Sequence, residues 1–169
     1  MNKMQQAITK LEAALTENEF VSVPNMNVAQ IRYIYGSLNL FYLNQIVQKE
    51  VEQAAAFDPE ELMMASAFGD MAVELIQINH TLGLPSLSEY QVNETYFFIN
   101  DMFELFNRMD KAIYQLSSQI IHSKTTHEPL DQALLTDMFD LLGSLAHYCG
   151  FSFKNSLQMA VDEFIEFLL

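Results

Sequence analysis

The sequence predicts an all-α protein: an antiparallel bundle of five to six helices that forms one domain over residues 1–169. Half of the residues are hydrophobic, which is enough to bury a substantial core in a chain of this length. The chain has only five glycines and four prolines, too few to supply the turns of a sheet protein. Apolar residues recur at helical spacing, without the long alternating β-branched runs that are typical of strands.

Three helices are expected in the first half of the chain. They are predicted over residues 2–15, 28–55 and 59–82. The first has one apolar face at helical spacing, and Asn25 or Asn27 is positioned to cap the second. The third begins at Asp58–Pro59, where a capping side chain precedes a proline in the first turn, and it ends before Gly83.

Three more helices are expected in the second half. They are predicted over residues 86–121, with Ser86 or Ser88 at the start, 130–149 and 153–168. A polar, turn-rich segment over residues 122–129 separates the first two of them. Gly150 is expected to end the fifth helix, and Ser152 to cap the sixth.

An internal repeat is one interpretation of this helix order. FYLNQIVQ (residues 41–48) aligns with FFINDMFE (residues 97–104), and Asp70, His80 and Gly83 align at constant spacing with Asp137, His147 and Gly150. A duplication would give two helical hairpins, residues 28–85 and 86–150, flanked by residues 1–24 and 152–169. Because helical sequences resemble one another easily, chance similarity is the alternative interpretation.

The net charge of −14 argues against binding to nucleic acid, which needs clustered basic residues. Between Lys49 and Arg108 the sequence contains no basic residue. No stretch reaches 18 uncharged apolar residues, and the first residues do not resemble a signal peptide, so we expect a cytoplasmic protein without a membrane span. The high apolar content predicts a further face to bury, and hence a homodimer.

Polar groups interrupt two apolar helical runs in the second half of the chain. Asn100, Asp101 and Glu104 lie in the first run, where four-residue spacing puts Asn100 and Glu104 on the same face. Asp137 opens the second run, and Asp140 lies one turn after it. Acids on an inward face are costly unless they are paired or bound to a metal. Since Mg²⁺ prefers oxygen ligands, these residues are candidates for a magnesium site between neighbouring helices.

The two motifs that contain these residues are NDMFE (residues 100–104) and LLTD followed by MFDLLGSLAHYCG (residues 134–150). They resemble the acidic motifs of the all-α nucleoside triphosphate pyrophosphohydrolases, the MazG-like group that includes phosphoribosyl-ATP pyrophosphohydrolase and the dimeric dUTPases. That family carries Glu-Glu-x-x-Glu on one helix and Glu-x-x-Asp on the next. The resemblance covers residues 28–165 in architecture.

The resemblance implies that Asp101, Glu104 and Asp137 are magnesium ligands. Asn100 and Leu134 stand where the family has glutamates. An amide oxygen at residue 100 still provides a weak metal ligand, whereas leucine provides none. The second motif therefore keeps its charge only if Asp137 and Asp140 act as a shifted pair.

The implied activity is magnesium-dependent hydrolysis of a nucleoside triphosphate or a related nucleotide, with release of pyrophosphate. In this reading Asp101 or Asp140 orients or deprotonates the attacking water. Arg108 and Lys111, beyond Glu104 on the same predicted helix, contact the phosphates. The alternative is that these two cations are solvent-facing partners of neighbouring acids.

A second function from a different class is a non-catalytic acidic bundle that binds a protein partner. The loss of acids at Asn100 and Leu134 favours this alternative. Retention of Asp101, Glu104 and Asp137 together favours the hydrolase. The two readings differ in one geometric respect, since only the hydrolase needs the carboxylates of Glu104 and Asp137 to converge.

Overall fold

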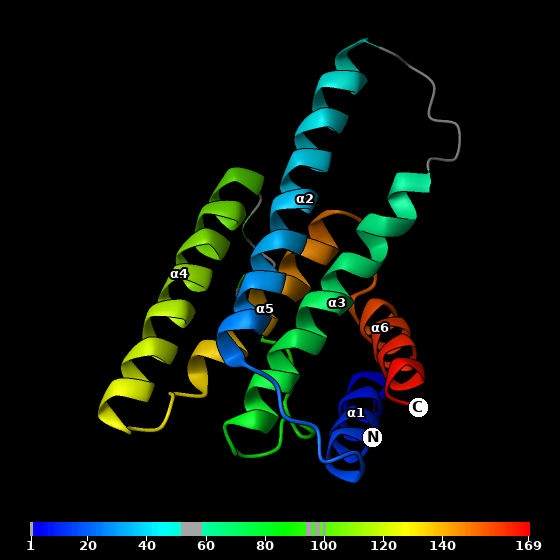
Figure 1. The fold of residues 1–169 in the computed structure, drawn as a ribbon. Helices are drawn as coiled ribbons and strands as arrows, with labels where there is room; N and C mark the ends of the chain where they lie inside the picture. The colour runs from blue at the N-terminus through cyan, green and yellow to red at the C-terminus, as the bar shows by residue number, and fades with distance from the viewer. Residues whose placement is uncertain (1, 52–58, 94–95, 97–98, 100) are drawn as a thin grey trace.

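The structure, a computed structural model, describes residues 2–51, 59–93, 96, 99 and 101–169; for residues 41–51 and 59–64 it describes the backbone alone. The described residues form six α-helices and no strand, which confirms the predicted all-α bundle (Figure 1). The helices are α1 (Lys3–Glu17), α2 (Pro24–Val51), α3 (Pro59–Thr81), α4 (Met102–Thr126), α5 (Ala133–Tyr148) and α6 (Phe153–Leu168). Within these ranges, no helix has both the length and the apolar character that a membrane crossing requires.

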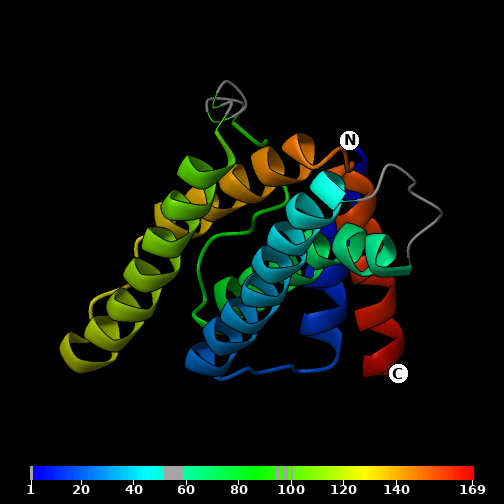
Figure 2. The ribbon, with the colours of Figure 1, turned by 90° about the horizontal axis from the view of Figure 1, so that it is seen from above.

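Helix α3 lies at the centre of the bundle (Figure 1). It packs against α2 on one side and α6 on the other, and it also contacts α1 and α5. Helix α4 lies on the far side of α2, where it packs against α2 and α5. Helices α1 and α6 lie side by side and begin at the same end of the bundle, so this pair is parallel (Figure 2). An ion pair of 2.7 Å between Lys10 and Asp162 joins them.

Several helix ends follow the predicted local signals. The Ser152 hydroxyl caps α6 by accepting the N–H of Asn155 at 3.3 Å. The cap of α1 is not among the predicted ones; it is Asn2, which forms a capping box with Gln5. Gly83 and Gly150 follow α3 and α5 with φ values of 67° and 82°, a left-handed conformation that glycine adopts without strain.

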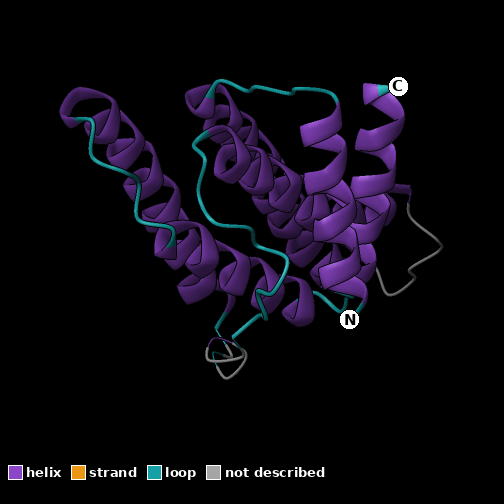
Figure 3. Ribbon diagram, turned by 90° about the horizontal axis from the view of Figure 1, so that it is seen from below, coloured by secondary structure: helices purple, strands orange, loops and turns teal. Residues whose placement is uncertain are grey.

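The predicted start of the fourth helix at Ser86 or Ser88 is wrong. Helix α4 begins at Met102, and it extends through Thr126 into the segment predicted to be a loop. The described part of the segment between α3 and α4 runs across the bundle mostly as irregular chain (Figure 3). Its apolar side chains, such as the buried Leu87, enter the core from this irregular chain. Their helix-like spacing therefore reflected burial and not helix formation.

The predicted cap of the second helix is also corrected. Helix α2 begins at Pro24, and Asn27 lies inside it as a buried residue. The Asn27 amide donates to Glu74 at 2.6 Å and to Gln77 at 3.0 Å, both on α3. Asn27 thus joins two helices and does not cap one. The predicted end of this helix at residue 55 and the predicted cap Asp58 lie outside the described residues.

The proposed repeat has a structural counterpart in one helix pair and not in the other. Helices α3 and α5 end alike. The N–H of Gly83 donates to the backbone carbonyl of His80, and the N–H of Gly150 donates to the backbone carbonyl of His147, each at 3.1 Å. The preceding helices differ. Residues 41–48 lie within α2, whereas the aligned segment reaches α4 only at its last three residues, after the N-cap Asp101.

Helices α3 and α6 approach most closely at Gly69. The Gly69 N–H donates to the Ser156 hydroxyl at 2.8 Å, and that hydroxyl donates to the carbonyl of Ala65. A Cβ atom on Gly69 would lie 2.0 Å from the Ser156 carbonyl oxygen. This separation is far below van der Waals contact, and the obstacle is backbone, so only glycine fits here.

We predict that Gly69→Ala lowers the free energy of unfolding by about 3 kcal/mol or more, because α6 must move away from α3. Gly36→Ala is the matched control. Gly36 is also inside a helix, but a Cβ there meets no atom within 4 Å, so alanine should stabilise the protein by up to about 1 kcal/mol. Urea unfolding of the three proteins measures both effects. Equal stability of Gly69→Ala and the wild type would contradict the close approach.

Candidate functional site

A cleft between α4 and α5 contains three of the predicted site residues: Arg108, Lys111 and Asp137. Its volume is about 190 Å³. The cleft is lined by Tyr96, Arg108, Lys111, Ala112, Gln115, Leu134, Asp137 and Leu141. Binding sites for small molecules usually enclose about 300–1,000 Å³. The cleft therefore has room for a single small group, such as one phosphate, but not for a whole nucleotide.

Arg108 is held in this cleft from two sides. Its guanidinium group lies over the ring of Tyr96, with 5.5 Å between the guanidinium carbon and the ring centroid. Its Nη2 also donates to a Glu104 carboxylate oxygen at 3.0 Å. This is a solvent-exposed pair one helical turn apart, the kind that contributes about 0.3–0.5 kcal/mol. The contact with Glu104 matches the alternative in which Arg108 is the partner of a neighbouring acid.

Asp140 is buried, with a relative exposure of 6 %, and lies on α5. One carboxylate oxygen accepts the hydroxyl of Tyr90 and the N–H of Asn93, the latter at 2.7 Å. Burial raises the pKa of the Asp140 carboxyl, whereas these two hydrogen bonds lower it, and the negative charge of nearby Asp137 raises it. Burial and the Asp140 carboxylate both raise the pKa of the Tyr90 hydroxyl, so Tyr90 stays protonated as the donor. The contact fixes the α3–α4 segment to α5.

Each of the other predicted ligands that the structure describes has its own contacts. Asp101 is the N-cap of α4, where its carboxylate accepts the N–H groups of Phe103 and Glu104 at 3.0 and 3.4 Å. Glu104 is exposed and pairs with Arg108. Asn100 lies outside the described residues. Among the residues that the structure describes, no three His, Cys, Asp or Glu side chains lie close enough together to hold a metal ion.

Asp101, Glu104 and Asp140 thus each contact a different neighbour. Magnesium binding stays a prediction. What the cleft offers chemically is two cations beside one exposed carboxylate and one aromatic ring.

No protein family model matches this chain, and comparisons with curated proteins and with solved structures found no significant match. The resemblance to the MazG-like pyrophosphohydrolases therefore stays a prediction that is based on the two motifs.

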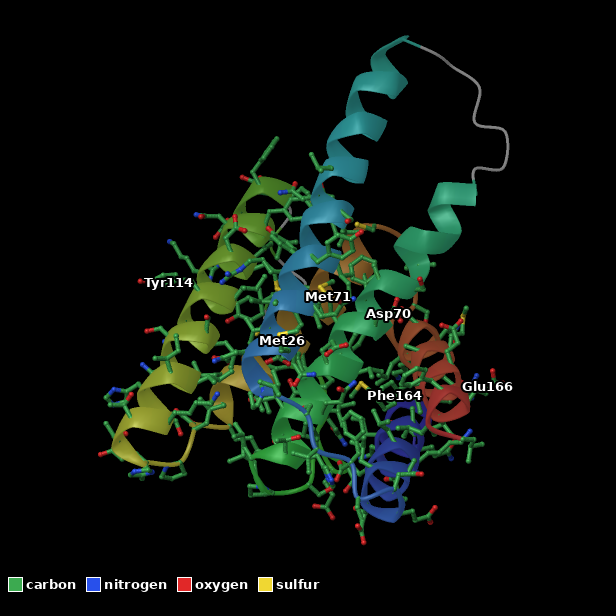
Figure 4. All side chains as sticks on the ribbon, viewed as in Figure 1. Met26, Asp70, Met71, Tyr114, Phe164 and Glu166 are labelled. Atoms are coloured by element: carbon green, nitrogen blue, oxygen red, sulfur yellow. The ribbon has the colours of Figure 1, made fainter. Side chains whose placement is uncertain are left out.

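A second group of acids lies between α3 and α6. Burial raises the pKa of Asp70 to about 6, and the charge of Glu163 on α6 adds to this effect. Burial also raises the pKa of Glu74, one turn further along α3, although its hydrogen bond with Asn27 opposes the shift. Figure 4 shows Asp70 and Met71 on different sides of α3, with Glu166 further along α6. The ionised form of Asp70 is thus disfavoured in the folded protein.

We predict that Asp70→Asn stabilises the protein at pH 7. The folded-state pKa is raised above the ordinary value of 3.8, so the wild type loses stability as the pH rises from about 4 through about 6. The variant lacks this loss. At pH 7 the variant should be more stable than the wild type by about 1 kcal/mol. This free energy is smaller than the full pKa difference would give, because solvent screens the partly exposed carboxylate. The difference should shrink towards pH 4 in thermal unfolding followed by circular dichroism.

Two control variants separate this effect from a general loss of negative charge. Glu163→Gln removes the like charge beside Asp70 and should also stabilise the protein at pH 7. Glu166→Gln removes an exposed acid from the same helix and should have little effect. A gain for Asp70→Asn that is the same at every pH would show that ionisation of Asp70 is not its cause.

Several residues of functional interest were missed from the sequence. Tyr96 completes the α4–α5 cleft, and its position over Arg108 has no local sequence signal. Met26, Tyr33 and Leu40 are exposed on α2, and their spacing of seven residues was a visible signal.

Proposed function

We propose that this protein is a non-catalytic helical-bundle protein that binds a protein partner, a second copy of the same chain, through helix α2. The observation that carries the proposal is an exposed apolar stripe on α2. Met26, Tyr33 and Leu40 are 68 %, 72 % and 66 % exposed. Their spacing of seven residues, two helical turns, puts them on one side of the helix.

The stripe lies opposite the face of α2 that enters the core. The buried residues of that face include Ile31, Tyr35 and Leu38. The Tyr35 hydroxyl donates to the carbonyl of Phe106 at 2.8 Å, which fastens this inner face to α4. Helix α2 is therefore apolar on two sides, and a single copy of the chain covers one of them. Exposed apolar stripes on a folded protein mark interaction surfaces.

The distribution of charge indicates which partner fits the stripe. The chain has 22 acidic residues, yet none lies between Glu19 and Glu50. In the described part of α2 with side chains, residues 24–40, Arg32 is the one charged residue. Two copies with a net charge of −14 repel each other when acidic faces meet, but not when two α2 stripes meet.

A two-fold axis places the same surface of both copies in contact, so the surface must be complementary to itself. An uncharged apolar stripe meets this requirement. Ala29 lies between Met26 and Tyr33 in the sequence, and such a small side chain allows two helix backbones to approach each other. Helix α2 spans 28 residues, or about 42 Å, which is long enough for an extended helix–helix contact.

We predict that the wild type sediments as a dimer at high micromolar concentration and that Tyr33→Ser weakens the dimer by about tenfold or more. The reason is that a large exposed aromatic residue contributes strongly when an interface buries it. Sedimentation velocity over a range of concentrations measures the effect.

Tyr114→Ser is the matched control. Tyr114 is 73 % exposed, but it lies on α4 and not on the stripe. This variant should dimerise like the wild type, and circular dichroism should show that both variants are folded. A wild type that stays monomeric at all concentrations, or equal weakening by both substitutions, would remove the second copy as the partner and overturn the proposal.

Nucleotide pyrophosphohydrolysis is the second candidate function, and one observation favours it. Arg108 and Lys111 lie beside Asp137 in one cleft, the combination of cations and carboxylate that a bound phosphate with its metal ion would need. Against it stand the separate uses of Asp101, Glu104 and Asp140.

We predict that the protein releases no pyrophosphate from the common nucleoside triphosphates in the presence of Mg²⁺ above a control without protein. An enzyme-coupled assay for pyrophosphate measures the release. Release that Glu104→Gln and Asp137→Asn abolish, and that the exposed α6 control Glu166→Gln retains, would establish the hydrolase and end the non-catalytic proposal.

A further inference from the structure

A larger cavity lies at the end of the bundle where α1 and α6 begin. Its volume is about 540 Å³, within the range of small-molecule sites. The cavity is lined by Asn2, Met4, Gln91, Val92, Gly143, His147, Phe151, Ser152, Phe153 and Lys154. These residues come from α1, the α3–α4 segment, α5, and the turn into α6. The cavity shares no residue with the α2 stripe or with the α4–α5 cleft.

Four of the ten lining residues of this cavity are apolar, and one is glycine. Met4, Gly143 and Phe153 are buried in its wall. Val92 and Phe151 are half-buried beside them. An apolar ligand body placed here would be removed from water on several sides, which is the main source of affinity in small-molecule sites.

The rim of the cavity is polar and carries positive charge. Lys154 supplies an ammonium group, and His147 and Gln91 supply further polar side chains. None of the lining residues is acidic, although the chain contains 22 acids and only eight Lys and Arg residues. In a protein with a net charge of −14, this part of the surface therefore favours an anion.

The backbone adds to this preference. Helices α1 and α6 both start at the rim, and a helix N-terminus presents N–H groups and a partial positive charge. The caps Asn2 and Ser152 accept the N–H groups of Gln5 and Asn155, at 2.8 and 3.3 Å. The other N–H groups of each first turn have no acceptor within their own helix.

We infer that this cavity binds a small amphipathic anion, a carboxylate attached to an unbranched or aromatic apolar body. The apolar body would lie against Val92 and Phe151, the apolar lining residues whose side chains are partly exposed. The carboxylate would lie at the rim, beside the Lys154 ammonium group and the first turn of α6. This inference does not depend on the proposed function, because it concerns other residues.

The test uses the full-length protein and decanoate as the probe, in isothermal titration calorimetry at low salt. Decanoate should bind, whereas decanol tests the apolar body without the charge and acetate tests the charge without the body. Both should bind at least about tenfold more weakly than decanoate. Added salt should weaken decanoate binding.

Lys154→Gln should weaken decanoate binding by about tenfold, because it removes the charge from the rim and keeps most of the side-chain volume. Lys124→Gln is the matched control, since Lys124 is an exposed lysine in the last turn of α4. It should bind decanoate like the wild type. Absence of decanoate binding, equal binding of decanol, or equal effects of the two substitutions would each overturn the inference.

Discussion

The crossing of α3 and α6 leaves no space for a side chain at Gly69. The Ser156 carbonyl occupies that position, and the Ser156 hydroxyl is hydrogen-bonded on both sides to the backbone of α3. Helix α3 also contacts α1, α2 and α5, so its fit against α6 determines where the other helices pack. Helix α6 also packs against α1, so a displacement of α6 at Gly69 would reach the contact between these two helices.

Capping residues and glycines in the sequence were sufficient to predict several helix ends. The capping residue Ser152 and the glycines at 83 and 150 marked ends that the structure has. The start of α4 has a local signal too, the cap Asp101 with Glu104 three residues later, but the helix-like spacing of the apolar residues before it predicted an earlier start. Leu87 is buried in the core from a stretch of irregular chain, and the bond that holds this stretch joins Tyr90 to Asp140, 50 residues later. The spacing of apolar residues thus indicated that these residues are buried, but it did not indicate the backbone conformation of the segment that carries them.

The candidate site illustrates the same limit. Of the four acids expected on inward faces, the structure buries Asp140 and exposes Asp101, Glu104 and Asp137. An acid within an apolar run thus has several physical solutions. Asp101 caps a helix, Asp140 accepts two hydrogen bonds from a loop, and Glu104 pairs with an arginine on its own helix. The sequence could not distinguish these solutions from a shared metal ion. The seven-residue spacing of Met26, Tyr33 and Leu40 on α2 was visible in the sequence, but which apolar face of α2 enters the core was not, since both faces are apolar.

Asp140 holds the α3–α4 segment through two hydrogen bonds, and this segment contributes residues both to the large cavity and to the α4–α5 cleft. Gln91 and Val92 form part of the wall of the large cavity, and Tyr96 forms part of the wall of the α4–α5 cleft. Between them, Asn93 is fastened to Asp140. A substitution at Asp140 would therefore remove a support from a residue that adjoins the cavity wall in the sequence, and would leave the buried end of Tyr90 without its carboxylate acceptor.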